Sequence, residues 1–207
     1  MKTRQLIKCI TINTLLGFPM GHTVSGDSFP NISILSANIF NLYPNLQVVD
    51  TYNNNHNVTI GIFSNLVEIA SRSLVGSFIE KVFLNIQQDY RLIPAAFADA
   101  QNLRLVDLGG TLNIPNNCFE NCSNLKVVWG QKTRTVGDNA FNKCINIKLI
   151  YLPNVNQISQ TAFTNANITY IVVPQLLIEK VKHQNPNAQV LAAENYKADD
   201  LLILADI

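Results

Sequence analysis

The sequence contains few charged residues. Asp, Glu, Lys and Arg make up 14% of its 207 residues, the formal net charge is +1, and no run of like charges occurs. A nucleic-acid groove or a polybasic membrane patch requires a local concentration of positive charge. We therefore expect neither nucleic acid nor a charged membrane surface as a partner.

Long apolar runs are also missing from the sequence. Hydrophobic residues make up 47% of the chain, yet no stretch is long and apolar enough to span a bilayer. Near the N-terminus, basic residues precede the segment Cys9–Gly17, which superficially resembles a secretory signal. Polar residues interrupt that segment and no small-residue cleavage site follows it. We expect a first β-strand from Gln5 to Asn13 that caps the fold, with a secretory signal as the alternative.

The sequence has little that indicates catalysis or metal binding. Its three histidines, His22, His56 and His183, share no ligand-like spacing, and no glycine-rich phosphate loop is present. No carboxylate pair and no Ser/His/Asp set stands out. We therefore expect a protein that is not an enzyme, with no catalytic residues, no metal site and no cofactor.

What the sequence does contain is an internal repeat. Phe97, Phe119, Phe141 and Phe163 are each 22 residues apart. The residue before each Phe is small, and an Asn followed by Leu or Ile comes a few residues later. Four units in register at all of these positions do not arise by chance, so the period indicates a repeat architecture.

The second half of each unit has the pattern of a β-strand. Its apolar positions read L-x-x-V-x-L, as in Leu103, Val106 and Leu108, and β-branched residues are frequent there. One unit cannot bury its apolar side alone, but stacked units can, because each apolar residue packs on its counterpart in the next unit. We expect stacked parallel strands in about seven rungs of roughly 22 residues, the first three irregular, with the Asn before each Leu bonding loop backbone groups.

The segment Asp138–Ile147 carries the features by which a family is identified. Its Ala-Phe is followed by a Cys and then by Asn-Ile. This pattern resembles the BspA-type leucine-rich repeat, also called the Treponema pallidum type, over about residues 31 to 174. The resemblance implies a leucine-rich-repeat solenoid, an α/β-type repeat protein, that serves adhesion or protein–protein contact at a cell surface. It implies no catalytic centre.

These features divide the chain into three parts. Residues 1–30 are expected to form an N-terminal cap segment, residues 31–174 the solenoid, and residues 175–207 a C-terminal cap helix and tail. Within the last part, Gln175 to Gln184 has the apolar spacing of one short helix, with Leu177, Val181 and Ile178 facing inward. The apolar segment Leu201–Leu204 is expected to dock, either on the same chain or on a partner or second copy.

Three of the four cysteines fall on repeat positions. Cys122 and Cys144 occupy a position that flanking repeats fill with Ala, and Cys118 is the small residue before Phe119. We interpret all three as small core residues, since free Cys is among the most buried types. A disulfide between Cys122 and Cys144 is the alternative, which side chains pointing in parallel disfavour.

The candidate binding residues lie at the outward positions of the strands. Side chains alternate across a strand, so the residues between the apolar core positions point away from the core. In the last three rungs these residues are apolar or aromatic, and we expect them to form an exposed patch of the kind that binds a partner. The alternatives are that β-propensity alone selected them or that the C-terminal segment covers them. The candidate residues are Phe83, Asp107, Val127, Trp129, Leu149, Tyr151, Tyr170 and Val172.

Two functional hypotheses follow from the sequence. The first is a non-enzymatic protein-binding module that uses the outward strand face, for adhesion at a cell surface. The second is a structural component of a larger assembly, such as a phage virion, because the interrupted signal-like segment and the segment Leu201–Leu204 suit a docked subunit. Cell-surface, extracellular, virion and intracellular locations all stay open, and a protein of unknown identity is the expected partner.

Overall fold

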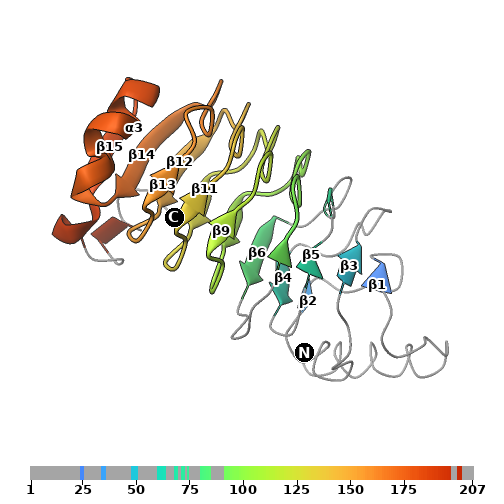
Figure 1. Ribbon diagram of the computed structural model, residues 1–207. Helices are drawn as coiled ribbons and strands as arrows, with labels where there is room; N and C mark the ends of the chain where they lie inside the picture. Colours follow the sequence, from blue (N-terminus) through green and yellow to red (C-terminus); the bar gives the residue numbers. More distant parts are fainter. Residues whose placement is uncertain are drawn as a thin grey trace, which may run out of the picture.

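The described chain winds into a stack of similar turns, each placed on the one before it (Figure 1). This computed structural model describes residues 24–25, 34–35, 48–50, 60–63, 68–69, 71–72, 74, 80–84, 91–196 and 200–201. Every strand pair in the described residues is parallel. Parallel stacking of successive units confirms the predicted leucine-rich-repeat solenoid.

The main sheet consists of eight strands in the order β15-β14-β12-β10-β8-β6-β4-β2. Each strand from β4 to β14 is paired with the strand of the preceding unit and with that of the following one. The bounds of these strands are β2 Ile34–Leu35, β4 Ile60–Phe63, β6 Lys81–Leu84, β8 Leu105–Asp107, β10 Val127–Trp129, β12 Ile147–Tyr151, β14 Ile168–Val173 and β15 Gln189–Ala192.

A second wall of the coil is built from very short strands. They form a four-stranded sheet in the order β1-β3-β5-β7 and a three-stranded sheet in the order β13-β11-β9. The sequence pattern does not predict these strands, because two or three residues are too few to show an alternation. Their bounds are β1 Val24–Ser25, β3 Val48–Asp50, β5 Glu68–Ile69, β7 Arg91–Leu92, β9 Asn113–Ile114, β11 Thr135–Val136 and β13 Gln157–Ile158.

The register of the main sheet preserves the sequence period. Val127 pairs with Leu105 on one side and with Leu149 on the other, a step of 22 residues each time. Leu149 pairs with Tyr170, a step of 21 residues. Equivalent residues of successive units therefore lie next to each other, so each outward position becomes a row running along the solenoid.

A column of phenylalanines fills the interior opposite the main sheet. The rings of Phe97, Phe119, Phe141 and Phe163 stack in sequence, with centroid separations of 5.3, 5.3 and 5.6 Å. The small residues before them, including Cys118 and Ala140, are 0% exposed. The repeated Phe position therefore forms one continuous column of stacked rings in the core.

Left-handed backbone conformations occur two residues before Phe97, Phe119 and Phe141 and two residues after all four phenylalanines. Asn117 and Asn139 lie two residues before a Phe with φ of 58° and 53°, and Asn121 and Asn165 lie two residues after one with φ of 59° and 54°. Asn enters this region more readily than most residues. The frequent Asn residues around the Phe positions are explained by these turns, which the sequence pattern alone does not predict.

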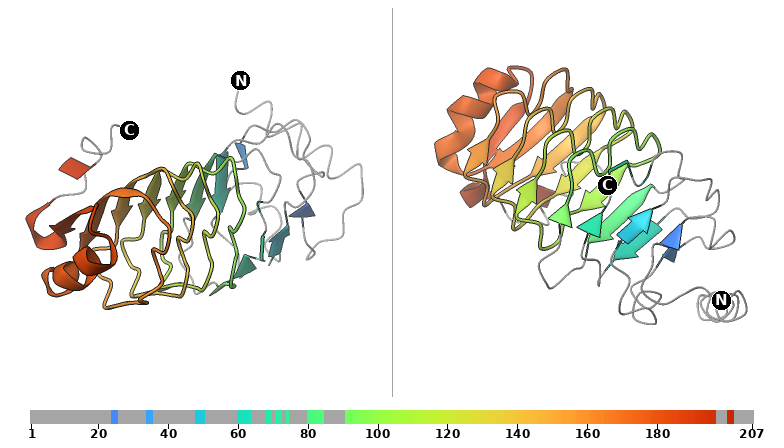
Figure 2. Two further views of the ribbon diagram at one scale, coloured as in Figure 1. Left: turned by 90° about the horizontal axis from the view of Figure 1, so that it is seen from above. Right: turned by 45° about the vertical axis from the view of Figure 1, so that its right-hand side comes forward.

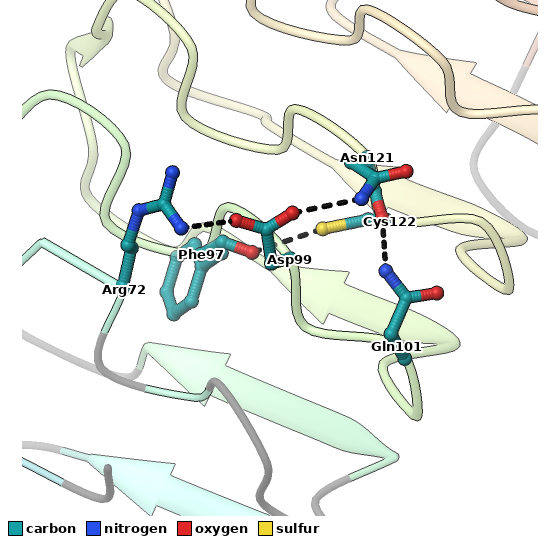
Figure 3. Close-up of polar contacts among 6 residues, drawn as sticks. All are labelled: Arg72, Phe97, Asp99, Gln101, Asn121 and Cys122. Carbon is teal, nitrogen blue, oxygen red and sulfur yellow. Dashed lines mark hydrogen bonds and ion pairs between the residues drawn. The ribbon is translucent and has the colours of Figure 1, made fainter.

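Side chains at these turns bond from one unit to the next (Figure 3). The Asp99 carboxylate accepts a hydrogen bond from Asn121 Nδ2 at 2.8 Å and forms an ion pair with Arg72 at 2.6 Å. Gln101 Nε2 donates to the Asn121 carbonyl at 2.7 Å. These contacts bridge three successive turns of the coil at its surface.

The Asn before each Leu or Ile makes the predicted backbone bond. Asn124 Nδ2 donates to the Gln101 carbonyl at 2.7 Å, Asn146 Nδ2 to Ser123 at 2.7 Å and Asn167 Nδ2 to Ile145 at 3.2 Å. The accepting carbonyl belongs to the preceding unit in every case. The Asn therefore joins adjacent units as well as ordering its own loop.

The three described cysteines are buried and free. Cys122 Sγ donates to the Phe97 carbonyl at 2.9 Å, and Cys144 Sγ repeats this contact with Phe119 at 3.0 Å (Figure 3). Desolvation raises the pKa of Cys144 to about 12 and raises the pKa values of Cys118 and Cys122 as well. The interpretation of these residues as core side chains is confirmed.

A short helix closes the C-terminal end of the coil. A 3-10 turn, η2 Gln175–Leu177, leads into α3 Ile178–Gln184, and β15 then pairs with β14 before a second turn, η3 Ala193–Asn195. Val181 is fully buried and Lys180 Nζ donates to the Ile158 carbonyl at 2.7 Å. The predicted cap helix is present. The expected strand Gln5–Asn13 and residues 202–204 lie outside the described residues, and the predicted domain boundaries stay predictions.

Candidate functional site: the outward face of the main sheet

The outward positions of the main sheet form two parallel rows. Strand pairing places Lys81, Leu105, Val127, Leu149, Tyr170 and Gln189 in one row. The other row contains Phe83, Asp107, Trp129, Tyr151, Val172 and Leu191. All eight residues predicted as binding residues lie in these two rows, so the register brings them onto one face.

The second wall of the coil has a different outward surface. Arg91, Asn113, Thr135 and Gln157 occupy its outward positions in β7, β9, β11 and β13. Thr135 Oγ1 donates to Asn113 Oδ1 at 2.7 Å, so these polar side chains bond along the row. The polar pocket on this wall, next to Asn116 and Asp138, is lined by side chains that also bond to one another. Apolar outward residues are thus concentrated on the main sheet.

The prediction that the apolar residues are exposed is wrong for four of them. Val127 is 2% exposed, Leu149 and Val172 are 0% exposed, and Tyr151 is 6% exposed. Trp129 and Tyr170 are partly buried. Leu149, Tyr151 and Val172 are buried because Leu201 and other residues that follow β15 pack onto them. Coverage by the C-terminal segment was one of the two alternatives drawn from the sequence.

Leu201 provides the central contact of this covering. Its side chain is 0% exposed and forms a buried cluster with Leu149, Tyr151 and Val172. The short red segment Asp200–Leu201 lies on the side of the coil that carries the main sheet (Figure 2). Leu201 therefore docks on its own chain, the first of the two possibilities expected for the segment Leu201–Leu204.

Aromatic and aliphatic side chains surround the Leu201 cluster. The partly buried residues packed against it are Trp129, Tyr170, Leu191, Ala193 and Tyr196. We call the set Trp129, Leu149, Tyr151, Tyr170, Val172 and Leu191 the strand-face patch.

Within this patch the rings of Trp129 and Tyr151 stack, with centroids 4.1 Å apart and an interplanar angle of 26°. Burial raises the pKa of Tyr151 above its ordinary value. The phenol is therefore neutral at physiological pH, and the patch presents an uncharged apolar surface to whatever covers it.

The face continues beyond the patch on β6 and β8. Phe83 is partly buried and Lys81 is exposed on β6. On β8, Leu105 and Asp107 are partly exposed, and the Asp107 carboxylate accepts a hydrogen bond from the Gly109 backbone N–H at 2.9 Å. Asp107 thus orders the glycine turn that follows its strand. Three of the predicted binding residues, Phe83, Asp107 and Val127, lie outside the cluster formed with Leu201.

Basic side chains border the face where the strands begin. Arg104, Lys126 and Lys148 are exposed and directly precede Leu105, Val127 and Leu149. Arg104 pairs with Glu80 at 3.7 Å. Basic residues therefore line one edge of the apolar face over three successive units, and the charge of Arg104 is compensated by Glu80.

The described residues contain no group of three or more His, Cys, Asp or Glu side chains that could hold a metal ion. Among the same residues, no helix has the length and apolar character that crossing a membrane requires. The arrangement on the main sheet consists of aromatic and aliphatic side chains, which supply contact area rather than acid–base chemistry.

Comparison with known proteins identifies the repeat. Residues 83–184 match six copies of the BspA type Leucine rich repeat region. No curated protein matches the chain.

Proposed function

The chain belongs to the BspA-type leucine-rich repeat family through residues 83–184, and from this premise we propose that it is a non-enzymatic protein-binding module that acts through the outward face of its main sheet. This type of repeat suggests a protein–protein interaction or adhesion module. The binding residues in this proposal are those named from the sequence, with adhesion at a cell surface as the role.

One observation carries the proposal, namely the contrast between the two walls of the coil. Both walls are parallel sheets with one side in the core, so β-propensity acts on both. The outward positions of the second wall are Asn113, Thr135 and Gln157, whereas those of the main sheet include Trp129 and Tyr151. Residues after β15 cover part of this face, but Trp129 keeps part of its surface open, and the apolar outward residues Phe83 and Leu105 lie beyond the cluster that Leu201 forms. Aromatic residues are the types that most often dominate binding energy at interfaces.

The uncovered part of the face provides the test. Lys81 is exposed and outward on β6, next to Phe83 and in register with Leu105. A photo-crosslinking amino acid placed at Lys81 samples this surface without removing a buried side chain. The same amino acid at Gln157, exposed and outward on β13, is the matched control on the other wall.

We expect a crosslinked adduct of defined mass from position 81 in extracts of the native source, and none from position 157. Adding Phe83→Ala to the position-81 variant should reduce the adduct several-fold. An adduct from position 157 alone would place binding on the second wall and overturn the proposal. The identity of the captured protein then distinguishes adhesion from assembly into a particle.

A further inference from the structure

Leu201 belongs to a cluster that is separate from the core of the coil. The core cluster runs from Ile69 to Ala192 and includes the phenylalanine column, but it contains none of Leu149, Tyr151, Val172 or Leu201. The interior of the solenoid is therefore complete without Leu201. The contact adds a second small apolar cluster on the outside of a sheet that is already packed on its inner side.

Few described residues cover the patch: Leu201 is buried in it, and Ala193 and Tyr196 pack against the cluster. Leu201 is buried, while Asp200 beside it is exposed, and Trp129 and Tyr170 keep part of their surface open. These few contacts must also offset the conformational entropy lost when the segment after β15 becomes ordered. An intramolecular contact of this kind is weak enough to exchange with a ligand that presents the same anchor and adds contacts of its own.

From these observations we propose that the strand-face patch is a docking site for a short segment of a partner protein, and that this segment contains a leucine preceded by acidic residues. The chain's own Asp200–Leu201 occupies the same site as a competing ligand. The inference rests on the proposed function, because it names the kind of partner segment that the strand face accepts and the contact that regulates access to it.

The chemistry of the patch supports a leucine anchor. Leu149 and Val172 form an aliphatic floor with no exposed surface, and the rings of Trp129, Tyr151 and Tyr170 stand around it. Rigid aromatic side chains next to aliphatic ones form an apolar surface on which one branched apolar side chain can pack at low entropic cost. The structure already places Leu201 there.

The charge around the patch supports acidic residues before the anchor. Lys126 and Lys148 are exposed at the edge where β10 and β12 begin, and Asp199 and Asp200 directly precede Leu201 in the sequence. Opposite charges at the rim of an apolar site favour one orientation of the bound segment and accelerate association. A partner segment with the order acidic, acidic, leucine has the same complementarity.

The protein contains a built-in reporter for this site. Trp129 is the one tryptophan in the chain and packs against the Leu201 cluster. Its fluorescence therefore reports occupation of the patch without any label. Leu201→Asp in the full chain removes the competing anchor, and Leu201→Ala is a milder second variant. Circular dichroism verifies that both variants fold.

The experiment uses a fluorescein-labelled synthetic peptide with the sequence of residues 197–207, titrated into the full chain and followed by anisotropy. We expect the L201D chain to bind the peptide about tenfold or more tightly than the wild-type chain, because a self-occupied site lowers apparent affinity by its open fraction. Trp129 emission should shift in L201D and return toward the wild-type value as peptide binds. A peptide in which leucine 201 is replaced by Asp should not bind.

Two matched changes locate the binding. Leu191→Asp, at the edge of the patch, should abolish peptide binding in the L201D chain, whereas Gln157→Asp on the second wall should leave it unchanged. Replacing both acidic residues of the peptide with Asn should weaken binding several-fold, as should Lys148→Gln in the chain.

Three results would overturn the inference. The first is an L201D chain, folded by circular dichroism, that does not bind the peptide. The second is Trp129 emission that is identical in the wild type, L201D and L201A. The third is a wild-type dimer in sedimentation equilibrium that L201D converts to monomer, which would assign the patch to a second copy of this chain. The crosslinking result from position 81 is independent of all three, so failure of this inference and failure of the proposed function are distinguishable.

Discussion

The indole of Trp129 lies over the phenol of Tyr151, one strand away, with 4.1 Å between ring centroids. The two residues are register partners on β10 and β12, 22 positions apart in the sequence. Aromatic pairs of this kind contribute about 0.5–1.5 kcal/mol beyond the area that they bury.

A double-mutant cycle measures this contribution. We expect Trp129→Leu and Tyr151→Leu to show a coupling of about 1 kcal/mol in the free energy of unfolding. Urea titrations followed by circular dichroism supply the four values. A control cycle pairs Trp129→Leu with Phe119→Leu, whose ring belongs to the other cluster, and it should give a coupling near zero. Equal coupling in both cycles would contradict a direct ring contact.

The asparagine bonds between units predict a specific sensitivity to Asp. Asn146 Nδ2 donates to the Ser123 carbonyl at 2.7 Å, and a carboxylate in its place has no proton to donate. We expect Asn146→Asp to lower the free energy of unfolding by about 0.5–1.5 kcal/mol. Asn156→Asp, at an exposed position before β13, adds the same charge and should change stability by much less. The prediction fails if the two variants unfold at the same urea concentration.

Gly130 occupies a position where a side chain does not fit. In neighbouring units the equivalent position is Leu108 or Leu152, but at Gly130 an added Cβ would lie 2.6 Å from Leu152 Cδ2 and 2.6 Å from Thr133 Oγ1. Thr133 is itself buried and donates to the Thr111 carbonyl at 3.2 Å. We expect Gly130→Ala to cost about 1–3 kcal/mol of stability through overpacking. In a Leu152→Val background the cost should be smaller, because one of the two clashing groups is shortened.

The buried thiols predict a loss of stability at alkaline pH. Burial raises the pKa of Cys144 to about 12, and it also raises the pKa values of Cys118 and Cys122. Unfolded thiols ionise near pH 8.5, so above that pH the unfolded state binds fewer protons than the folded state. The stability contributed by the neutral thiols is complete below about pH 8.5 and decreases as pH rises toward the folded pKa values, by up to about 1.4 kcal/mol per pH unit for each thiol.

Urea unfolding between pH 7 and pH 10 checks this expectation. The matched control replaces Cys118, Cys122 and Cys144 by Ala, the residue that neighbouring repeats carry at these positions. The wild type should lose more stability than the control over this range, since other titrating groups are common to both. Parallel pH profiles for the two proteins would show that the thiols do not determine the loss.

Repeat positions were predictable from the sequence because stacking forces the same contact in every unit. The Phe column, the inward leucines and the bond made by Asn146 all recur with a fixed period, so each unit supports the interpretation of the others. The short strands of the second wall were not predictable. Two residues such as Thr135 and Val136 carry no periodicity, and their pairing depends on the register that the main sheet imposes.

The candidate site was predictable in part. The rows that contain Trp129 and Tyr151 follow from the alternation of side chains across a strand. The burial of Leu149 and Val172 does not follow from this alternation, because it arises from Leu201. Leu201 lies outside the repeats and is separated from them in the sequence by the cap helix and β15. Periodicity describes contacts between equivalent residues, and Leu201 has no equivalent in any unit.

The in-register pairing of the main sheet also has a consequence for how such a molecule changes in length. Each unit from β8 to β12 makes its contacts with residues 22 positions away, so its two neighbours have interchangeable surfaces. Duplicating one unit would lengthen the molecule by one strand spacing, about 4.8 Å, while both ends keep the contacts that they have now. The number of units, and with it the span of the outward face, can therefore be adjusted in evolution or by design without redesigning the fold.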